Sequence, residues 1–143
     1  MKKKVLSLLA FLGLISYFAV FTQEAKADVD YDITNMDVTA KVNRDGSLTM
    51  HRRIDYEFDS DAHGVFYKQN LAKKQNLTGV KVKVNGQSVV SSNSGKNNTY
   101  QLTRSGDSYL FKVFHRIDED DNVKVEYSYR ILNAITRDRK SVV

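Results

Sequence analysis

Hydrophobic and polar residues alternate along much of this chain with a period of two. The clearest stretch spans residues 48–58. Five of its six alternate positions are apolar, and the residues between them are polar or charged. A helix would scatter such residues around its circumference, whereas a strand places them all on one face. We therefore predict a strand with one buried face, formed by Leu48, Met50, Arg52, Ile54, Tyr56 and Phe58.

Short turn sequences separate further alternating stretches and predict hairpins. Residues 38–42 alternate in the same way, and the Asp45-Gly46 pair that follows them tolerates the positive φ of a tight turn. Asn85-Gly86 supplies a second two-residue turn of this kind. It joins residues 80–84 to residues 87–90, and the remaining predicted strands cover residues 100–102, 109–113 and 123–130.

These stretches amount to about seven short strands at the spacing typical of antiparallel sandwiches. We predict an all-β domain, an antiparallel β-sandwich that is immunoglobulin-like only in its general architecture. Residues 62–71 follow the longest predicted strand and are assigned to a connection between strands. This connection is unusual because it holds three large apolar residues in a row beside a glycine.

The first 27 residues have the three parts of a signal peptide. Lys2–Lys4 are positively charged, residues 5–21 are apolar apart from two serines, and Ala25-Lys26-Ala27 offers the small residues that a signal peptidase accepts. A retained transmembrane anchor would need roughly 20 apolar residues, and polar residues follow the run instead. We predict a signal-peptide helix over residues 1–27, cleavage before Asp28, and export of the mature protein.

Removing this leader removes most of the positive charge. The chain holds 22 Lys and Arg against 17 Asp and Glu, and the leader takes four Lys and one Glu, which leaves 18 against 16. This balance excludes the basic surface of a nucleic-acid-binding protein. The chain also has no cysteine, which excludes disulfides and thiol-based catalytic or zinc sites. An apolar core alone must hold the domain together.

The polar residues form no recognisable catalytic or metal-binding motif. The three histidines do not have the spacing of metal ligands, and no nucleophile motif is present. Asp118, Asp120 and Asp121 belong to an acidic cluster, which is a weak candidate for a cation site. A run of this kind is more often a solvated loop. We predict a non-enzymatic domain without a cofactor, in which the acidic cluster is a solvated loop whose charges keep strand ends apart.

The apolar run after the longest strand allows two interpretations. Val65, Phe66 and Tyr67 follow His63-Gly64 in what we take to be a connection. They either fill one end of the sandwich, which we favour because monomers seldom expose such patches, or form a contact site for a partner. In the second case His63, Phe66 and Tyr67 are the candidate binding residues.

Several of these segments together resemble one known family. They are Tyr31-Asp32-Ile33, Asn43-Arg44-Asp45-Gly46-Ser47-Leu48, His63-Gly64-Val65-Phe66-Tyr67 and Tyr127–Ile135. In this combination the chain resembles the N-terminal extracytoplasmic domain of the YciQ-like predicted membrane proteins, a family of unknown function. Family members often have Arg and then Pro soon after the aromatic pair. Here Lys68 takes that place and the chain has no proline, which points to a divergent branch.

The resemblance implies an architecture more than an activity: a signal peptide, this β domain, then transmembrane helices. We expect a domain over residues 28–137 that is a fragment of a longer protein, because residues 138–143 look like a translated sequencing adapter. The expected function is a binding or interaction module at the cell envelope, with an envelope protein or a glycan as partner. The alternative is a structural part of an envelope membrane complex, where the domain packs on its own membrane helices without a separate ligand.

Overall fold

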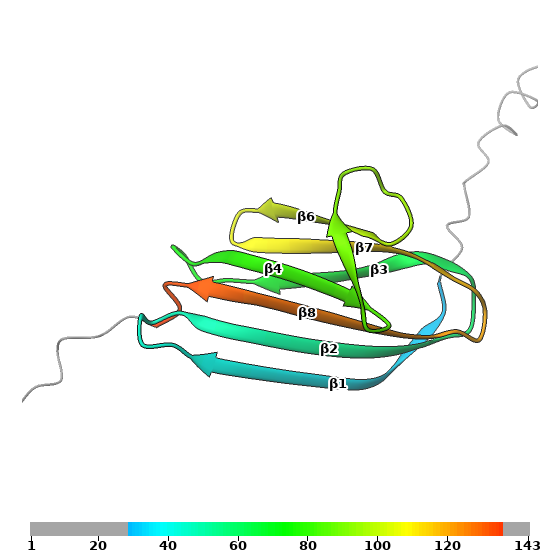
Figure 1. The fold of residues 1–143 in the computed structure, drawn as a ribbon, viewed down its shortest axis with the longest axis horizontal. Helices are drawn as coiled ribbons and strands as arrows, with labels where there is room; N and C mark the ends of the chain where they lie inside the picture. The colour runs from blue at the N-terminus through cyan, green and yellow to red at the C-terminus, as the bar shows by residue number, and fades with distance from the viewer. Residues whose placement is uncertain (1–28, 136–143) are drawn as a thin grey trace, which may run out of the picture.

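The computed structural model describes residues 29–135. The predicted signal peptide, the cleavage site before Asp28 and the tail over residues 138–143 lie outside the described residues. The described part contains eight β-strands and no α-helix (Figure 1). It therefore offers no helix of the length and apolarity that a membrane crossing requires. The strands are β1 (Tyr31–Val42), β2 (Leu48–Phe58), β3 (Ala62–Asn70), β4 (Asn76–Val84), β5 (Gln87–Ser91), β6 (Thr99–Ser105), β7 (Ser108–Ile117) and β8 (Asn122–Leu132).

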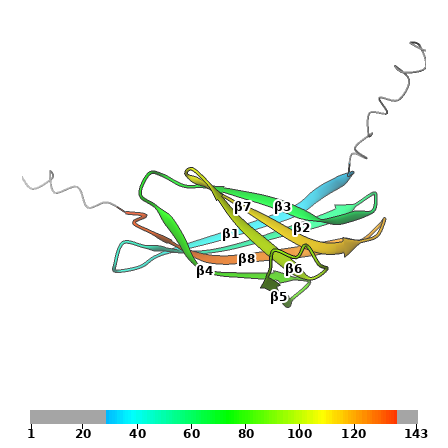
Figure 2. The same cartoon turned by 90° about the horizontal axis from the view of Figure 1, so that it is seen from above.

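The eight strands form one curled sheet in the order β1-β2-β8-β4-β5-β6-β7-β3. The all-β prediction is confirmed, but the seven-stranded antiparallel sandwich is not. β5 explains the difference, because it pairs with β4 on one side and with β6 on the other. The β5–β6 pairing is parallel, which makes the sheet mixed and links into one half-barrel what would otherwise be two sheets (Figure 2).

The eighth strand is β3, which we had assigned to a connection. Its alternation is hidden in the sequence by a register shift between Ala62 and Gly64. Gly64 has φ of +154°, and a Cβ on it would lie 1.9 Å from the carbonyl oxygen of Val113 in the neighbouring β7. Only glycine permits that approach. The residue that looked like a loop signal is therefore required for close pairing of two strands.

The predicted hairpins are present. β1 and β2 pair in antiparallel fashion around a turn in which the Asn43 amide donates to the Ser47 carbonyl at 2.8 Å and Gly46 has φ of +82°. Asn85 and Gly86 both have positive φ between β4 and β5, as a two-residue hairpin turn requires. Turn chemistry thus predicted the local connections correctly.

The core lies on the concave side of the curled sheet, here called the inner face. β8 occupies the centre of the β1–β2–β8–β4 region, and Val125 and Tyr127 on it are completely buried. β3 and β7 cover this region from above (Figure 2). Tyr67 of β3 stacks on Tyr127 with ring centroids 4.9 Å apart, and Phe111 of β7 meets the same ring edge-on at 5.2 Å. Aromatic contacts of this kind hold the two layers together.

Candidate functional site

Strand β1 presents an apolar row that the rest of the domain leaves uncovered. The row lies on the inner face, because its members pair directly with inner-face residues of β2, as Ile33 does with Tyr56 and Met36 with Ile54. Its five large side chains are between 46 % and 59 % exposed. We call this set the β1 row: Tyr31, Ile33, Met36, Val38, Ala40 and Val42.

The β1 row is exposed because the covering layer ends with β3, whose Tyr67 contacts Tyr127 of β8 and Arg52 of β2 rather than β1. β3 is the last strand of the sheet on its side, and β1 is the last on the other. The two meet only near their starts, where Tyr31 faces Val65 and Phe66 across a hollow of about 130 Å³. We call the β1 row together with the unpaired edge of β3 the open seam.

The interpretation that Val65, Phe66 and Tyr67 together fill one end of the core is wrong for Phe66. Strand alternation divides the three residues: Val65 is 8 % exposed and points inward with Tyr67, whereas Phe66 points outward and is 68 % exposed. The ammonium group of Lys112, its cross-strand neighbour, lies 5.9 Å from the centre of the Phe66 ring. Phe66 is thus an exposed aromatic residue at the rim of the open seam.

The three predicted binding residues do not form a single site. His63 and Phe66 share a mostly apolar hollow of about 230 Å³ on the outer side of β3. Tyr67 lies on the opposite side of that strand, where its hydroxyl donates to Gln69 Oε1 at 2.7 Å. A ligand at the outer hollow would therefore touch His63 and Phe66 but not Tyr67.

The acidic cluster forms the turn between β7 and β8. The Asp118 amide donates to the Asp121 carboxylate at 2.9 Å, and the Asp118 carboxylate pairs with Arg116 at 3.3 Å. Asp120 has φ of +68° at the corner of the turn. Within residues 29–135 no group of three or more potential ligands is placed to hold a metal ion. The Asp121 carboxylate thus helps to close the turn.

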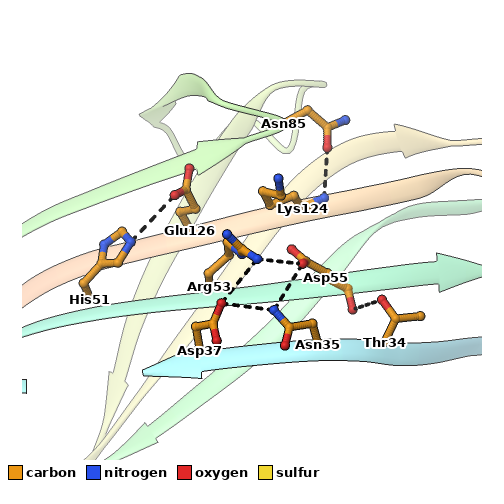
Figure 3. A network of polar contacts seen from close by, with 9 residues as sticks. All are labelled: Thr34, Asn35, Asp37, His51, Arg53, Asp55, Asn85, Lys124 and Glu126. Carbon is orange, nitrogen blue, oxygen red and sulfur yellow. Dashed lines mark hydrogen bonds and ion pairs between the residues drawn. The ribbon is translucent and has the colours of Figure 1, made fainter. Parts of the chain in front are cut away.

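A network of charged and polar side chains covers the outer face of β1, β2 and β8 (Figure 3). Arg53 Nη2 pairs with Asp37 at 3.2 Å and with Asp55 at 3.3 Å. Asn35 donates to the Asp37 carboxylate at 3.0 Å, which ties the edge strand to β2. Arg53 thus joins carboxylates of two neighbouring strands. The network therefore holds β1 against β2 on the outer face, while the inner face of β1 stays exposed.

Arg52 is the one charged residue on the inner face of β2, and sequence reasoning did not single it out. It pairs across the sheet with Val38 on one side and with Tyr127 on the other. Its guanidinium lies 4.8 Å from the centre of the Tyr67 ring, and its Nη1 donates weakly to Met36 Sδ at 3.6 Å. Its interruption of an otherwise apolar row was the available signal.

The buried tyrosines beside Arg52 are neutral. Burial raises the pKa of Tyr129, and a hydrogen bond with Tyr67 raises it further, against the opposing charge of Arg52. Burial also raises the pKa of Tyr127 well above its ordinary value. Neither phenol can supply a negative charge at neutral pH. The surroundings of Arg52 thus offer aromatic rings and hydroxyl groups but no anion.

The fold and the seam define a small all-β domain whose edge strand carries an exposed apolar row. Comparison with known protein families identifies the family of the chain. Residues 32–141 match the N-terminal domain of a family described as predicted membrane protein (DUF2207). The chain belongs to this family, which is consistent with the resemblance to YciQ-like proteins. No curated protein and no solved structure matches the chain.

Proposed function

We propose that this domain is a non-enzymatic interaction module on the extracytoplasmic side of the membrane, and that it receives a strand of a partner polypeptide in the open seam. Membership in a predicted membrane protein family supports a place at the membrane. The predicted leader supports export. The single observation that carries the proposal is the β1 row, which continues the core on the inner face and is left half exposed.

Covering this row would release substantial free energy. Complete burial of one Val, Ile or Met side chain contributes roughly 1.5–3 kcal/mol. The large side chains of the β1 row are about half buried already, so each has part of that free energy still to gain. An exposed row of this length on a monomer is a recognised sign of an interaction surface.

The backbone favours a strand as the occupant. β3 pairs with β7 along one edge and with no strand of the described chain along the other. Its free amides and carbonyls can accept an added strand, whose alternate side chains would then point down onto the β1 row. An acyl chain would leave these backbone groups unpaired. The hollow at the start of the seam is also small, about 130 Å³.

A photo-crosslinking amino acid placed at Val38 tests this proposal in the cells that produce the protein. Val38 lies on the β1 row, and its neighbour Thr39 lies on the outer face of the same exposed strand. We expect position 38 to crosslink to one contiguous segment of a partner protein, identified by mass spectrometry of the crosslinked peptide. Position 39 is the matched control and should give no such product.

The result also separates the two expected roles. A product from position 38 that comes only from the same polypeptide would show that the seam is filled internally. That outcome would favour the structural component of an envelope complex and overturn the proposal. Equal products from positions 38 and 39 would show non-specific exposure of β1 and would overturn it as well.

A further inference from the structure

Arg52 marks the boundary between the covered and uncovered parts of the inner face. On one side its cross-strand neighbour is the completely buried Tyr127, and on the other it is Val38 of the β1 row. Above it lies Tyr67 of β3, the strand that borders the open seam. The guanidinium therefore lies between β3 and the β1 row, where a strand added beside β3 would contact it.

The charge of this guanidinium is not balanced within residues 29–135. No carboxylate there forms an ion pair with Arg52, and its Nε is buried without a hydrogen-bond partner. Arg53 on the outer face also has a buried Nε without a partner, but it differs from Arg52 because its Nη2 pairs with both Asp37 and Asp55. An unpaired cation in a largely apolar setting is costly. Arg52 is thus prepared for an anion that arrives from outside the domain.

A second copy of this chain cannot supply that anion from the equivalent surface. The β1 row contains five aliphatic or sulfur-containing side chains and one tyrosine, with no carboxylate among them. Packing two such rows against each other would bury the apolar surface but leave Arg52 unpaired. A partner of different sequence, with an acidic residue among apolar ones, satisfies both requirements.

We propose that the open seam selects a partner strand with an acidic residue opposite Arg52 and apolar residues two positions before and after it. The spacing follows from strand geometry, because residues two apart point to the same face. The carboxylate would accept hydrogen bonds from the guanidinium, a pairing favoured by the planar donors of arginine. The apolar residues would cover Met36 and Ala40, the neighbours of Val38 in the row. This inference rests on the proposed function and specifies which partner strands the open seam accepts.

Selection from a displayed library of random twelve-residue peptides tests the proposal with the exported chain. Wild type should enrich peptides with the pattern apolar-x-acidic-x-apolar. For the best peptide, replacing the acidic residue by its amide should weaken binding to wild type about tenfold or more, the size expected for a charged hydrogen bond. The same replacement should change binding to Arg52→Met less than about twofold. Lys124→Met, on the outer face of β8, is the control and should behave like wild type.

A second pair of variants approaches the same contact from the other strand. Val38→Glu places a carboxylate directly opposite Arg52 in the cross-strand position, so it should neutralise the guanidinium internally and abolish the preference for an acidic peptide. Val38→Gln has the same size without the charge and should keep the preference. Circular dichroism confirms that each variant is folded, and the acid-to-amide change in the peptide leaves the domain untouched.

The outcomes separate this inference from the function on which it rests. If the wild-type domain enriches no peptide that binds to the β1 row, the proposed strand-binding function is overturned. Enriched apolar peptides without an acidic position would leave that function standing and overturn the role of Arg52. An acidic preference that persists unchanged in Arg52→Met would overturn that role too.

Discussion

Strands β1 and β8 have similar lengths and both alternate apolar and polar residues, yet they end in opposite environments. Every residue of β1 is exposed, whereas the inner side chains of β8 are all buried, from Val123 to Ile131. Both strands lie in the same sheet and present the same inner face. The difference comes from the layer above, which covers β8 and stops before β1. Alternation identifies the face of a strand that is fit for burial, and coverage by other elements decides whether it is buried.

The largest expected effect comes from ionising the buried tyrosines. Burial raises the pKa of Tyr56 to about 12 and moves those of Tyr127 and Tyr129 in the same direction. Below pH 10, the ordinary pKa of tyrosine, the phenols are neutral in the folded and unfolded chain alike, so stability is complete. Above it the unfolded chain releases protons that the folded chain holds, and stability falls towards pH 12.

We therefore expect cooperative unfolding within that alkaline window. Tyrosinate absorbance at 295 nm and the strand signal in circular dichroism should change together. A gradual tyrosine titration centred near pH 10, with the strand signal intact, would show that these phenols are less buried than the structure has them.

Ile54→Ala and Met36→Ala compare coverage within one cross-strand pair. The two residues face each other on β2 and β1, but Ile54 is 2 % exposed and Met36 is 46 % exposed. We expect Ile54→Ala to cost roughly 2–5 kcal/mol, as a buried aliphatic side chain does, and Met36→Ala less than about 1 kcal/mol. Chemical denaturation measures both. Similar losses for the two variants would mean that β1 is covered in solution.

Gly64→Ala should disrupt the pairing of β3 with β7 inside the covering layer and leave the strands beneath it paired. The new methyl group would meet the Val113 carbonyl oxygen, so β3 must move away from β7. We expect a loss of about 3 kcal/mol, at the upper end for a strained backbone position. Hydrogen exchange should show weaker protection in β3 and β7 while β1 and β2 keep their pairing. A variant with unchanged protection in β3 would contradict the close approach.

Tyr67→Ala and Phe66→Ala compare an inward-facing aromatic side chain with an exposed one on the same strand. Tyr67 packs on Phe111 and Tyr127 and contacts the Arg52 guanidinium, so its loss should cost about 2 kcal/mol. Phe66 is exposed, and its loss should cost less than about 1 kcal/mol. Thermal melting of the two variants decides. A larger loss for Phe66→Ala would restore the interpretation that it fills the core.

The smallest expected effect is that of Tyr127→Phe. The Tyr127 hydroxyl is completely buried and has no hydrogen-bond partner in the described part of the chain. Removing an unpaired polar atom while keeping the ring should raise stability slightly, by no more than about 0.5 kcal/mol. A loss above that size in urea denaturation would reveal a hidden partner for the hydroxyl.

Local structure was predictable from the sequence where a short segment carries the information. The turns at Asp45-Gly46 and Asn85-Gly86 and the inner face of β2 all follow from neighbouring residues. β3 was missed because its register shift at Gly64 breaks the period-two signal. The parallel β5–β6 pairing was missed because it rests on only two residue pairs, brought together across a polar loop.

The candidate site was harder to predict because it depends on what is absent above a strand. The alternation of Val38 and Val42 is the same whether or not a layer covers them, so their exposure has no local signature. The aromatic run predicted part of the site. It indicated Phe66, which borders the seam, and Tyr67, whose ring contacts the Arg52 guanidinium. The charge that distinguishes the seam was visible in the sequence only as one exception in an apolar pattern.

The direction of β1 and β8 bears on how the domain responds to mechanical force. The start of β1 and the end of β8 lie at opposite ends of the sheet, and both strands run antiparallel to β2 between them (Figure 1). Their hydrogen bonds are perpendicular to the strands. A pull between these two ends therefore loads the bonds on both sides of β2 simultaneously, in shear, rather than opening them one after another. A domain with this geometry resists tension applied along its strands between these two ends.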